Sequence, residues 1–231
     1  MNGKNRSNQA APGRNFCYRY PSAAMPAPRT IGIVLFEGFE LLDVFGPCEA
    51  YGSRGLDGAF RLVMVARETG PIASAQGPSA VADYSFTTAP HLDLLLIPGG
   101  IGTRREVNND ALVEWLRARA DQVEIVTSVC TGAALLARAG LLDGHRATTN
   151  KRAFQWVASQ GPSVNWIKQA RWVEDGKFAT SSGVSAGIDM ALALIARLVS
   201  PGAAEETAIT MEYEWHRDAG WDPFAKINGL T

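Results

Sequence analysis

A single cysteine stands where a buried β-strand is expected to give way to a helix. Residues 124–129 form a short, mostly β-branched apolar run, and Ala and Leu then recur at helical spacing over residues 133–142. Cys130 therefore lies in the turn between them, near unpaired backbone N–H groups and the positive end of a helix dipole. Such a position favours the thiolate, which is the nucleophilic form of cysteine. The alternative is a small buried hydrophobe, the fate of most free cysteines.

Two further segments with polar or glycine residues follow predicted strands. Residues 37–43 contain Asp43, and residues 98–102 contain Gly99 and Gly100. Because ligands bind outside the carboxyl ends of the strands in open α/β sheets, we expect both segments to lie near Cys130. Each also has an ordinary interpretation, since the glycines could be turn residues and Asp43 a helix cap or a surface charge. Together they supply a nucleophile, a carboxyl group and backbone N–H donors, as covalent catalysis at an unsaturated carbon requires.

Alternating strands and helices are expected to position these residues. Apolar runs predict strands at residues 30–36, 60–66, 94–97, 124–129 and 147–150, with hairpins within 70–86 and 164–183. Helical spacing predicts helices within residues 40–52, 109–122, 133–142, 151–161, 186–199 and 202–218. Pro47 is expected in the first turn of its helix, and Asp175-Gly176 at the tip of the second hairpin. This order predicts an α/β fold in which helices cover both faces of a parallel sheet.

The domain organisation predicted from the composition is simple. Residues 1–28 carry four basic and no acidic residues and are expected to be a flexible tail before a single domain over residues 29–231. Across the 231 residues the net charge is −1, which removes the main electrostatic argument for binding nucleic acid. The longest apolar stretch, AGIDMALALIARLV, is too short to cross a bilayer and contains two charges.

The three cysteines, Cys17, Cys48 and Cys130, have no paired spacing. Neither a disulfide framework nor a zinc site is therefore indicated, and a reducing, cytoplasmic location is the default expectation. We accordingly predict no metal, no cofactor, no membrane partner and no nucleic-acid partner, with a small molecule as substrate.

Five segments, in order over about residues 30–210, resemble the ThiJ/PfpI superfamily, namely FEGFELLDVFGP, LLLIPGG, VTSVCTGAALLARAGLLDG, RATT and SSGVSAGIDMAL. This resemblance implies a class I glutamine-amidotransferase-like, flavodoxin-like fold with Cys130 at a nucleophile elbow. It also implies a homodimer.

Within the superfamily, the D-x-x-G-P segment and the C-T-G elbow are most similar to those of isonitrile hydratases. The resemblance then implies that Cys130 is the nucleophile and Asp43 its neighbouring carboxyl group. Thr131 would hold the substrate or an anionic intermediate through its hydroxyl or N–H group, and Gly100 would contribute a backbone N–H to an oxyanion-like hole. Many members of the superfamily carry Glu near the thiol, so an Asp at position 43 restricts the resemblance to a smaller subgroup.

The chain departs from its relatives at two places. Asn150 stands where many relatives have a histidine, and the segment EYEWHRDAGWDPF replaces a proline-rich ending. None of His91, His145 and His216 matches the position of a catalytic histidine. Amide hydrolysis needs a proton shuttle to the departing amine, usually His. Hydration of an isonitrile expels no amine, so a Cys–Asp pair suits that reaction better.

Two alternative functions stay open at this point. A glyoxalase- or deglycase-like enzyme acting on reactive carbonyls would also begin with attack by a thiolate. A non-enzymatic redox sensor or regulator would use oxidation of Cys130 instead. Many relatives of this subgroup are regulators with a C-terminal helix-turn-helix region, but we expect none here because too few residues follow the last predicted helix.

Overall fold

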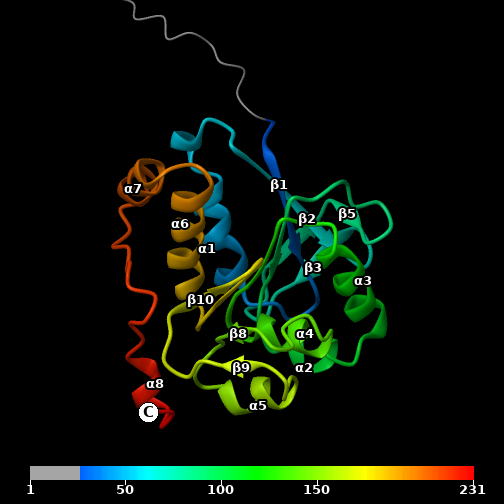
Figure 1. Ribbon diagram of the computed structural model, residues 1–231. Helices are drawn as coiled ribbons and strands as arrows, with labels where there is room; N and C mark the ends of the chain where they lie inside the picture. Colours follow the sequence, from blue (N-terminus) through cyan, green and yellow to red (C-terminus); the bar gives the residue numbers. More distant parts are fainter. Residues whose placement is uncertain (1–26) are drawn as a thin grey trace, which may run out of the picture.

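Seven strands form one mostly parallel sheet in the computed structural model, which describes residues 27–231 (Figure 1). All but the last two residues of the predicted tail lie outside the described residues. The strand order is β10-β11-β7-β6-β1-β2-β5, and β10–β11 is its antiparallel pair. The strands are β1 (Arg29–Val34), β2 (Phe60–Ala66), β5 (Tyr84–Ser85), β6 (Leu94–Ile97), β7 (Ile125–Ser128), β10 (Trp172–Asp175) and β11 (Phe178–Ser181).

Helices cover both faces of this sheet, as the sequence predicts. Helices α1, α6 and α7 pack together on one face, and α3 and α4 pack on the other (Figure 1). The short α5 and α8 share a small apolar cluster near the carboxyl edge of the sheet. The helices are α1 (Leu41–Tyr51), α2 (Thr103–Glu106), α3 (Asp110–Ala120), α4 (Ala133–Arg138), α5 (Phe154–Ser159), α6 (Ala186–Leu198), α7 (Pro201–Thr210) and α8 (Phe224–Ile227), with 3-10 turns η1 (Arg54–Leu56) and η2 (Cys130–Gly132).

The central strands β6 and β7 bring the predicted site segments together. Every residue of both strands is buried, which explains why β6 is entirely apolar and why β7 begins with Ile and Val. The strands pair in parallel with Leu94 opposite Ile125 and Ile97 opposite Ser128. The chain therefore leaves both strands at the same edge, and the turn at residues 98–102 lies beside the turn that begins at Cys130.

Two predicted helices have different bounds in the structure. Helix α1 begins at Leu41, so Pro47 lies inside the helix and the prediction of its first-turn position is wrong. Pro47 has no N–H to donate to the carbonyl four residues earlier, that of Asp43. The predicted helix over residues 202–218 ends at Thr210, because Glu212 adopts a left-handed backbone with φ of 48°.

The hairpin predictions agree better with the structure. Strands β3 (Gly70–Ala73) and β4 (Ser79–Ala82) pair antiparallel, and the β10–β11 hairpin turns at Gly176-Lys177, one residue later than the predicted Asp175-Gly176, because Asp175 still pairs with Phe178. The predicted strand at 147–150 is reduced to β8 (Arg146–Ala147), which pairs with β9 (Asn165–Trp166). Helix α2 was not predicted, because its four residues are too few to show a helical repeat.

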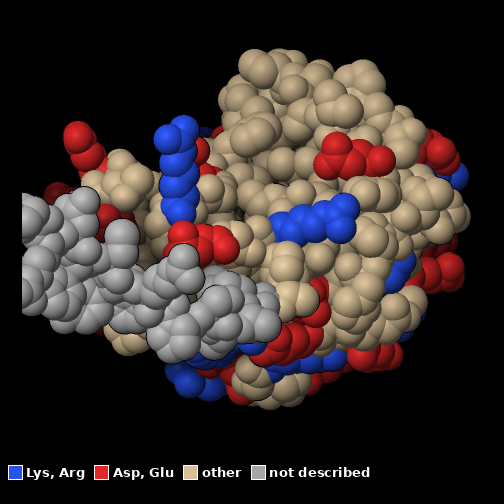
Figure 2. Space-filling view, turned by 90° about the horizontal axis from the view of Figure 1, so that it is seen from above, with Lys and Arg blue, Asp and Glu red and all other residues tan. Residues whose placement is uncertain are grey.

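Charged side chains are dispersed over the face at which β1 begins. Figure 2 shows acidic and basic groups there, some of them side by side, which form no broad basic surface. Among the described residues, no helix is both long enough and apolar enough to cross a membrane.

Candidate active site

The nucleophile elbow forms where β7 leaves the sheet. Cys130 adopts a left-handed backbone with φ of 57°, which L-residues avoid at a cost of roughly 1–2 kcal/mol. Both of its backbone groups are held in place. Its N–H donates to the Ser182 carbonyl at 2.9 Å, and its carbonyl accepts the Thr149 hydroxyl at 2.7 Å. Tertiary hydrogen bonds thus maintain a strained turn at the predicted nucleophile.

Asp43 reaches this elbow from the first turn of α1 and is fully buried. Its Oδ2 accepts the Gly99 N–H at 2.7 Å, whereas its Oδ1 has no hydrogen-bond partner among residues 27–231. Burial raises the pKa of Asp43 well above its usual range, and the contacts with Gly99 and Cys130 offset only part of that rise. The carboxyl group therefore retains a proton more readily than an exposed aspartate does.

Thr131 lies against the glycine turn that follows β6. A Cβ atom on Gly99 would lie 2.5 Å from Thr131 N, 2.7 Å from its Oγ1 and 2.9 Å from Asp43 Oδ2, so these atoms converge on one point. Gly100 has φ of 117° and donates its N–H to Thr131 Oγ1 at 3.1 Å. The Thr103 hydroxyl also lies 3.1 Å from Thr131 Oγ1. Gly100 thus orients Thr131, and its predicted role toward a substrate anion stays a prediction.

The protonation of Cys130 differs from the expectation based on its position before a helix. Burial raises the pKa of the thiol, and the negative charge of Asp43 raises it further. The N–H and hydroxyl of Thr131 act in the opposite direction but do not outweigh those two effects. The prediction of a low thiol pKa in the resting protein is therefore wrong, because the elbow is buried beside a carboxylate.

The thiol and the carboxyl group are consequently coupled. The charge of Asp43 raises the pKa of the thiol, whereas the contact with Cys130 lowers the pKa of Asp43, so the pair loses its first proton more easily than its second. A buried Cys–Asp pair that holds one proton can form a thiolate by transferring that proton to the carboxylate. The same carboxyl group can then act as an acid toward a bound substrate.

No histidine supplies a proton shuttle at this pair. His91 faces Asp93, His145 faces Asp175 and His216 stacks on Trp221, so each imidazole is engaged elsewhere. Asn150 occupies the expected position after β8, and its Oδ1 accepts the Ala153 N–H at 3.0 Å. Its amide does not titrate, so the proton chemistry of the elbow is left to the Cys–Asp pair.

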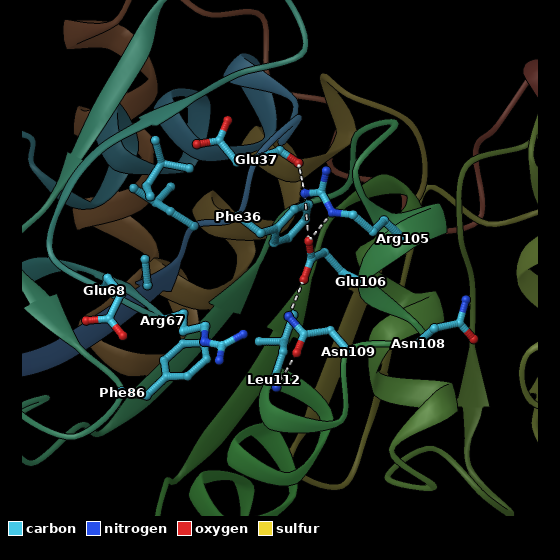
Figure 3. Close-up of a pocket in the computed structure, with 13 residues that line it drawn as sticks. Phe36, Glu37, Arg67, Glu68, Phe86, Arg105, Glu106, Asn108, Asn109 and Leu112 are labelled. Carbon is cyan, nitrogen blue, oxygen red and sulfur yellow. Dashed lines mark hydrogen bonds and ion pairs between the residues drawn. The ribbon is translucent and has the colours of Figure 1, made fainter.

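Two cavities lie near the carboxyl edge of the sheet. The smaller, about 270 Å³, adjoins the elbow through Ser182 and is lined by Asn150, Lys151, Arg152, Arg171, Ser182, Gly183, Val184, Ser185, Phe224 and Asn228. The larger, about 640 Å³, is lined by Leu35, Phe36, Glu37, Ala66, Arg67, Glu68, Ile72, Phe86, Arg105, Glu106, Asn108, Asn109 and Leu112. None of the predicted site residues lines the larger cavity, which Figure 3 shows.

Several residues at the site were not identified as functional from the sequence. Thr103, Thr149 and Ser182 hold the reactive turn, and Lys151 and Asp222 form a buried ion pair beside it. Thr149 and Ser182 belong to the RATT and SSGVSAGIDMAL segments, so the motifs indicated the region without the roles. Among residues 27–231, no group of three or more His, Cys, Asp or Glu side chains could hold a metal ion.

Known proteins share these features to different extents. The isonitrile hydratase of Pseudomonas putida is 33% identical over 183 residues, which are 79% of this chain and 78% of that protein. The HTH-type transcriptional regulator GbdR of Pseudomonas aeruginosa is 30% identical over 173 residues, which are 74% of this chain but 47% of the regulator. The crystal structure of a THiJ/PfpI family protein from Pseudomonas syringae covers 96% of this chain, and this chain covers 90% of it, with a TM-score of 0.76 and 26% identity.

The family assignment follows from the extent of the match. The profile of the DJ-1/PfpI family matches residues 29–197, which contain the sheet strands, the glycine turn and the cysteine elbow. The strand order and the elbow agree with the fold expected from the sequence motifs. The chain therefore belongs to the DJ-1/PfpI family.

Proposed function

We propose that the protein is a cysteine-dependent enzyme that adds water to an isonitrile and releases an N-substituted formamide. The observation that carries the proposal is the buried Asp43, which leaves Oδ1 without a partner beside the Cys130 thiol. An unpaired buried carboxyl oxygen is costly for stability, and such costs are concentrated at functional sites. The similarity to the Pseudomonas putida isonitrile hydratase supports the same reaction.

The reaction can be written with one shuttling proton. Asp43 takes the thiol proton, and the Cys130 sulfur forms a bond to the terminal carbon of the isonitrile. Asp43 then returns the proton to that carbon, which gives a thioimidate with an N=CH–S linkage. Water adds to the same carbon, the nitrogen gains a proton, and the C–S bond breaks to restore the thiol. The sum is isonitrile plus water to formamide, with Asp43 as base and then acid.

Thr131 is suited to stabilising the charge that forms during these steps. Its N–H and hydroxyl both lower the pKa of the neighbouring thiol, so they favour the thiolate. The hydrogen bonds from Gly100 and Thr103 fix the orientation of its hydroxyl. Donors that are oriented before the reaction stabilise developing charge without reorganising during it.

A turnover screen tests the proposal. A set of isonitriles and, separately, methylglyoxal would be incubated with the parent protein, and formamide or lactate would be quantified. The Cys130→Ala protein, checked for folding by circular dichroism, is the blank because it lacks the nucleophile. We expect formamide from the parent protein alone. Turnover of methylglyoxal without any turnover of isonitriles would instead support a glyoxalase-like enzyme.

A second candidate is a non-enzymatic sensor, favoured by the similarity to the transcriptional regulator GbdR. In that case Cys130 would respond to a small molecule or an oxidant without turning over substrate. Oxidation alone does not separate the two functions, because a catalytic thiol also oxidises. Failure of every isonitrile and carbonyl in the screen, with a ligand-dependent rise in melting temperature, would favour the sensor.

A further inference from the structure

Both backbone groups of the strained nucleophile are held by residues that a buried ion pair contacts. Ser182, whose carbonyl accepts the Cys130 N–H, donates its own hydroxyl to Asp222 Oδ2 at 2.7 Å. Thr149, whose hydroxyl binds the Cys130 carbonyl, accepts the Lys151 ammonium at its own carbonyl at 3.3 Å. Lys151 Nζ and Asp222 Oδ2 are 3.4 Å apart, which closes a ring of contacts around the elbow.

The ion pair is fixed by further hydrogen bonds. The Lys151 ammonium donates to Thr148 Oγ1 at 2.6 Å and to the Ala170 carbonyl at 2.9 Å, and its side chain is 2% exposed. Asp222 Oδ1 accepts the Phe224 N–H at 3.0 Å. Burial lowers the pKa of Lys151 to about 8, and the charge of Asp222 opposes that lowering. Asp222 therefore helps to keep Lys151 charged and able to donate at neutral pH.

A buried pair of this kind is poor evidence for stability alone. Removing two charges from water costs several kcal/mol per ion, and apolar replacements are often neutral or stabilising. The pair instead lies where the backbone needs external support, since Cys130 is one of three non-glycine residues with positive φ among the described residues. Through Ser182 and Thr149, the ion pair helps to fix the N–H and the carbonyl of Cys130.

We propose that Lys151 and Asp222 are positioning residues that hold the Cys130 elbow in its strained conformation. The proposal rests on the proposed function only for the identity of Cys130 as the nucleophile. It also gives the segment after α7 a role, because this segment carries Asp222 to the elbow. The segment is held on the way by its own contacts, in which the His216 N–H donates to Asp189 Oδ1 and the Ala219 carbonyl accepts the Arg171 N–H.

Site-resolved alkylation of Cys130 tests the proposal without any substrate. Asp222→Asn keeps the shape of the side chain but removes the charge that Lys151 faces. We expect the rate of iodoacetamide modification of Cys130 to fall roughly tenfold, by analogy with the smallest losses seen when a side chain that orients a metal ligand is removed. The strained turn aligns the sulfur with the Thr131 N–H, which favours the thiolate, so relaxation makes the thiol less reactive. Ser182→Ala removes only one link and is expected to slow alkylation by a smaller factor.

Asp189→Asn is the matched control. It removes a carboxylate from another buried pair, with Arg171, and weakens the same C-terminal segment, but Asp189 contacts neither Ser182 nor Thr149. We expect alkylation at the parental rate in this variant. If isonitrile turnover is found, Asp222→Asn should lower kcat and leave KM nearly unchanged.

The outcomes separate a positioning role from a general loss of stability. Folding of each variant is checked by circular dichroism and melting temperature. Parental or faster alkylation in folded Asp222→Asn, or equal slowing in Asp189→Asn, would overturn the proposal. Should Asp222→Asn fail to fold, a parental rate in Ser182→Ala would overturn it instead. Because alkylation needs no substrate, its result stands even if the protein hydrates no isonitrile.

Discussion

The carboxyl edge of the sheet contains two hollows whose linings differ in kind. The larger has an apolar floor that includes Phe36, and its buried Glu106 is satisfied by Arg105 at 2.7 Å and by the Asn109 side chain at 2.7 Å (Figure 3). The smaller adjoins an elbow where a carboxyl oxygen of Asp43 lacks a partner and Cys130 has a strained backbone. The buried carboxylate of the larger hollow is thus fully paired, whereas the buried carboxyl group at the elbow is not.

This difference shows that cavity size does not by itself indicate where the chemistry occurs. Ligand pockets in proteins commonly have volumes of about 300–1,000 Å³, and the larger hollow falls in that range. It offers no nucleophile, and its one buried carboxylate is already paired. The reactive groups lie where burial raises pKa values and where the backbone departs from its preferred conformations. Substitutions in the two regions should therefore have very different effects.

The largest effect is expected from Cys130→Ser. A hydroxyl without a histidine base is not activated, so this variant should have no measurable turnover of the substrate found by the isonitrile screen. The matched change in the larger hollow is Glu106→Gln, which keeps the shape and the contact with Asn109. We expect Glu106→Gln to keep kcat within about threefold of the parent, which is less than about 1 kcal/mol in activation free energy. Activity in Cys130→Ser, or its loss in Glu106→Gln, would reverse the roles of the two regions.

A smaller but still large loss is expected from Asp43→Asn. The amide oxygen can accept the Gly99 N–H as Oδ2 does, but the side chain can no longer take and return a proton. Turnover should fall on the order of 10²–10⁴-fold, the usual range for general acid–base catalysis. Steady-state kinetics at neutral pH measure this loss. Near-parental turnover would show that Asp43 has no acid–base role.

The same substitution should increase stability. The folded-state pKa of Asp43 is raised, so the unfolded state ionises first, and the stability of the native state falls as the pH rises from the ordinary aspartate pKa to the folded-state pKa. Below the ordinary aspartate pKa of about 3.9, both states are protonated and the penalty is absent. Asp43→Asn should therefore have a higher unfolding free energy than the parent at neutral pH, by about 1.4 kcal/mol for each unit by which the pKa of Asp43 is raised.

Denaturant unfolding at neutral pH and at about pH 4 measures this gain, which should shrink as the pH falls toward the ordinary pKa of aspartate. Equal stability of the parent and Asp43→Asn at both pH values would indicate that the buried carboxyl group costs the fold nothing. The elbow would then resemble the larger hollow in its electrostatics.

Much of the fold could be predicted because its signals are local. The apolar runs of β1, β2, β6 and β7 and the helical spacing of α3 and α6 identify the sheet and its layers. The position of Cys130 between a strand and a helix also follows from local pattern. Asp43 and Gly100 were assigned to the site by resemblance, and the structure places them beside Thr131.

The remaining features depend on contacts between distant segments. The support of the elbow by Thr149 and Ser182 joins residues that are 19 or more positions apart from Cys130 or Asp222. Residues 213–222, which follow α7, are positioned by tertiary contacts, and these cannot be predicted from helical spacing. The direction of the thiol pKa likewise depends on burial, which the position of Cys130 before a helix does not reveal.

The coupling of Cys130 and Asp43 is tested most directly by the pH dependence of Cys130 alkylation in the parent and in Asp43→Asn. Cys48 is an internal reference, because burial raises its pKa to about 12 and Asp43 is not among the causes of that shift. In the parent, alkylation of Cys130 should show an apparent pKa above about 8.5, the value of a free thiol. Asp43→Asn removes the neighbouring negative charge and should move that apparent pKa downward, with no change at Cys48. An unchanged or higher apparent pKa of Cys130 in Asp43→Asn would contradict a proton shared between the two groups.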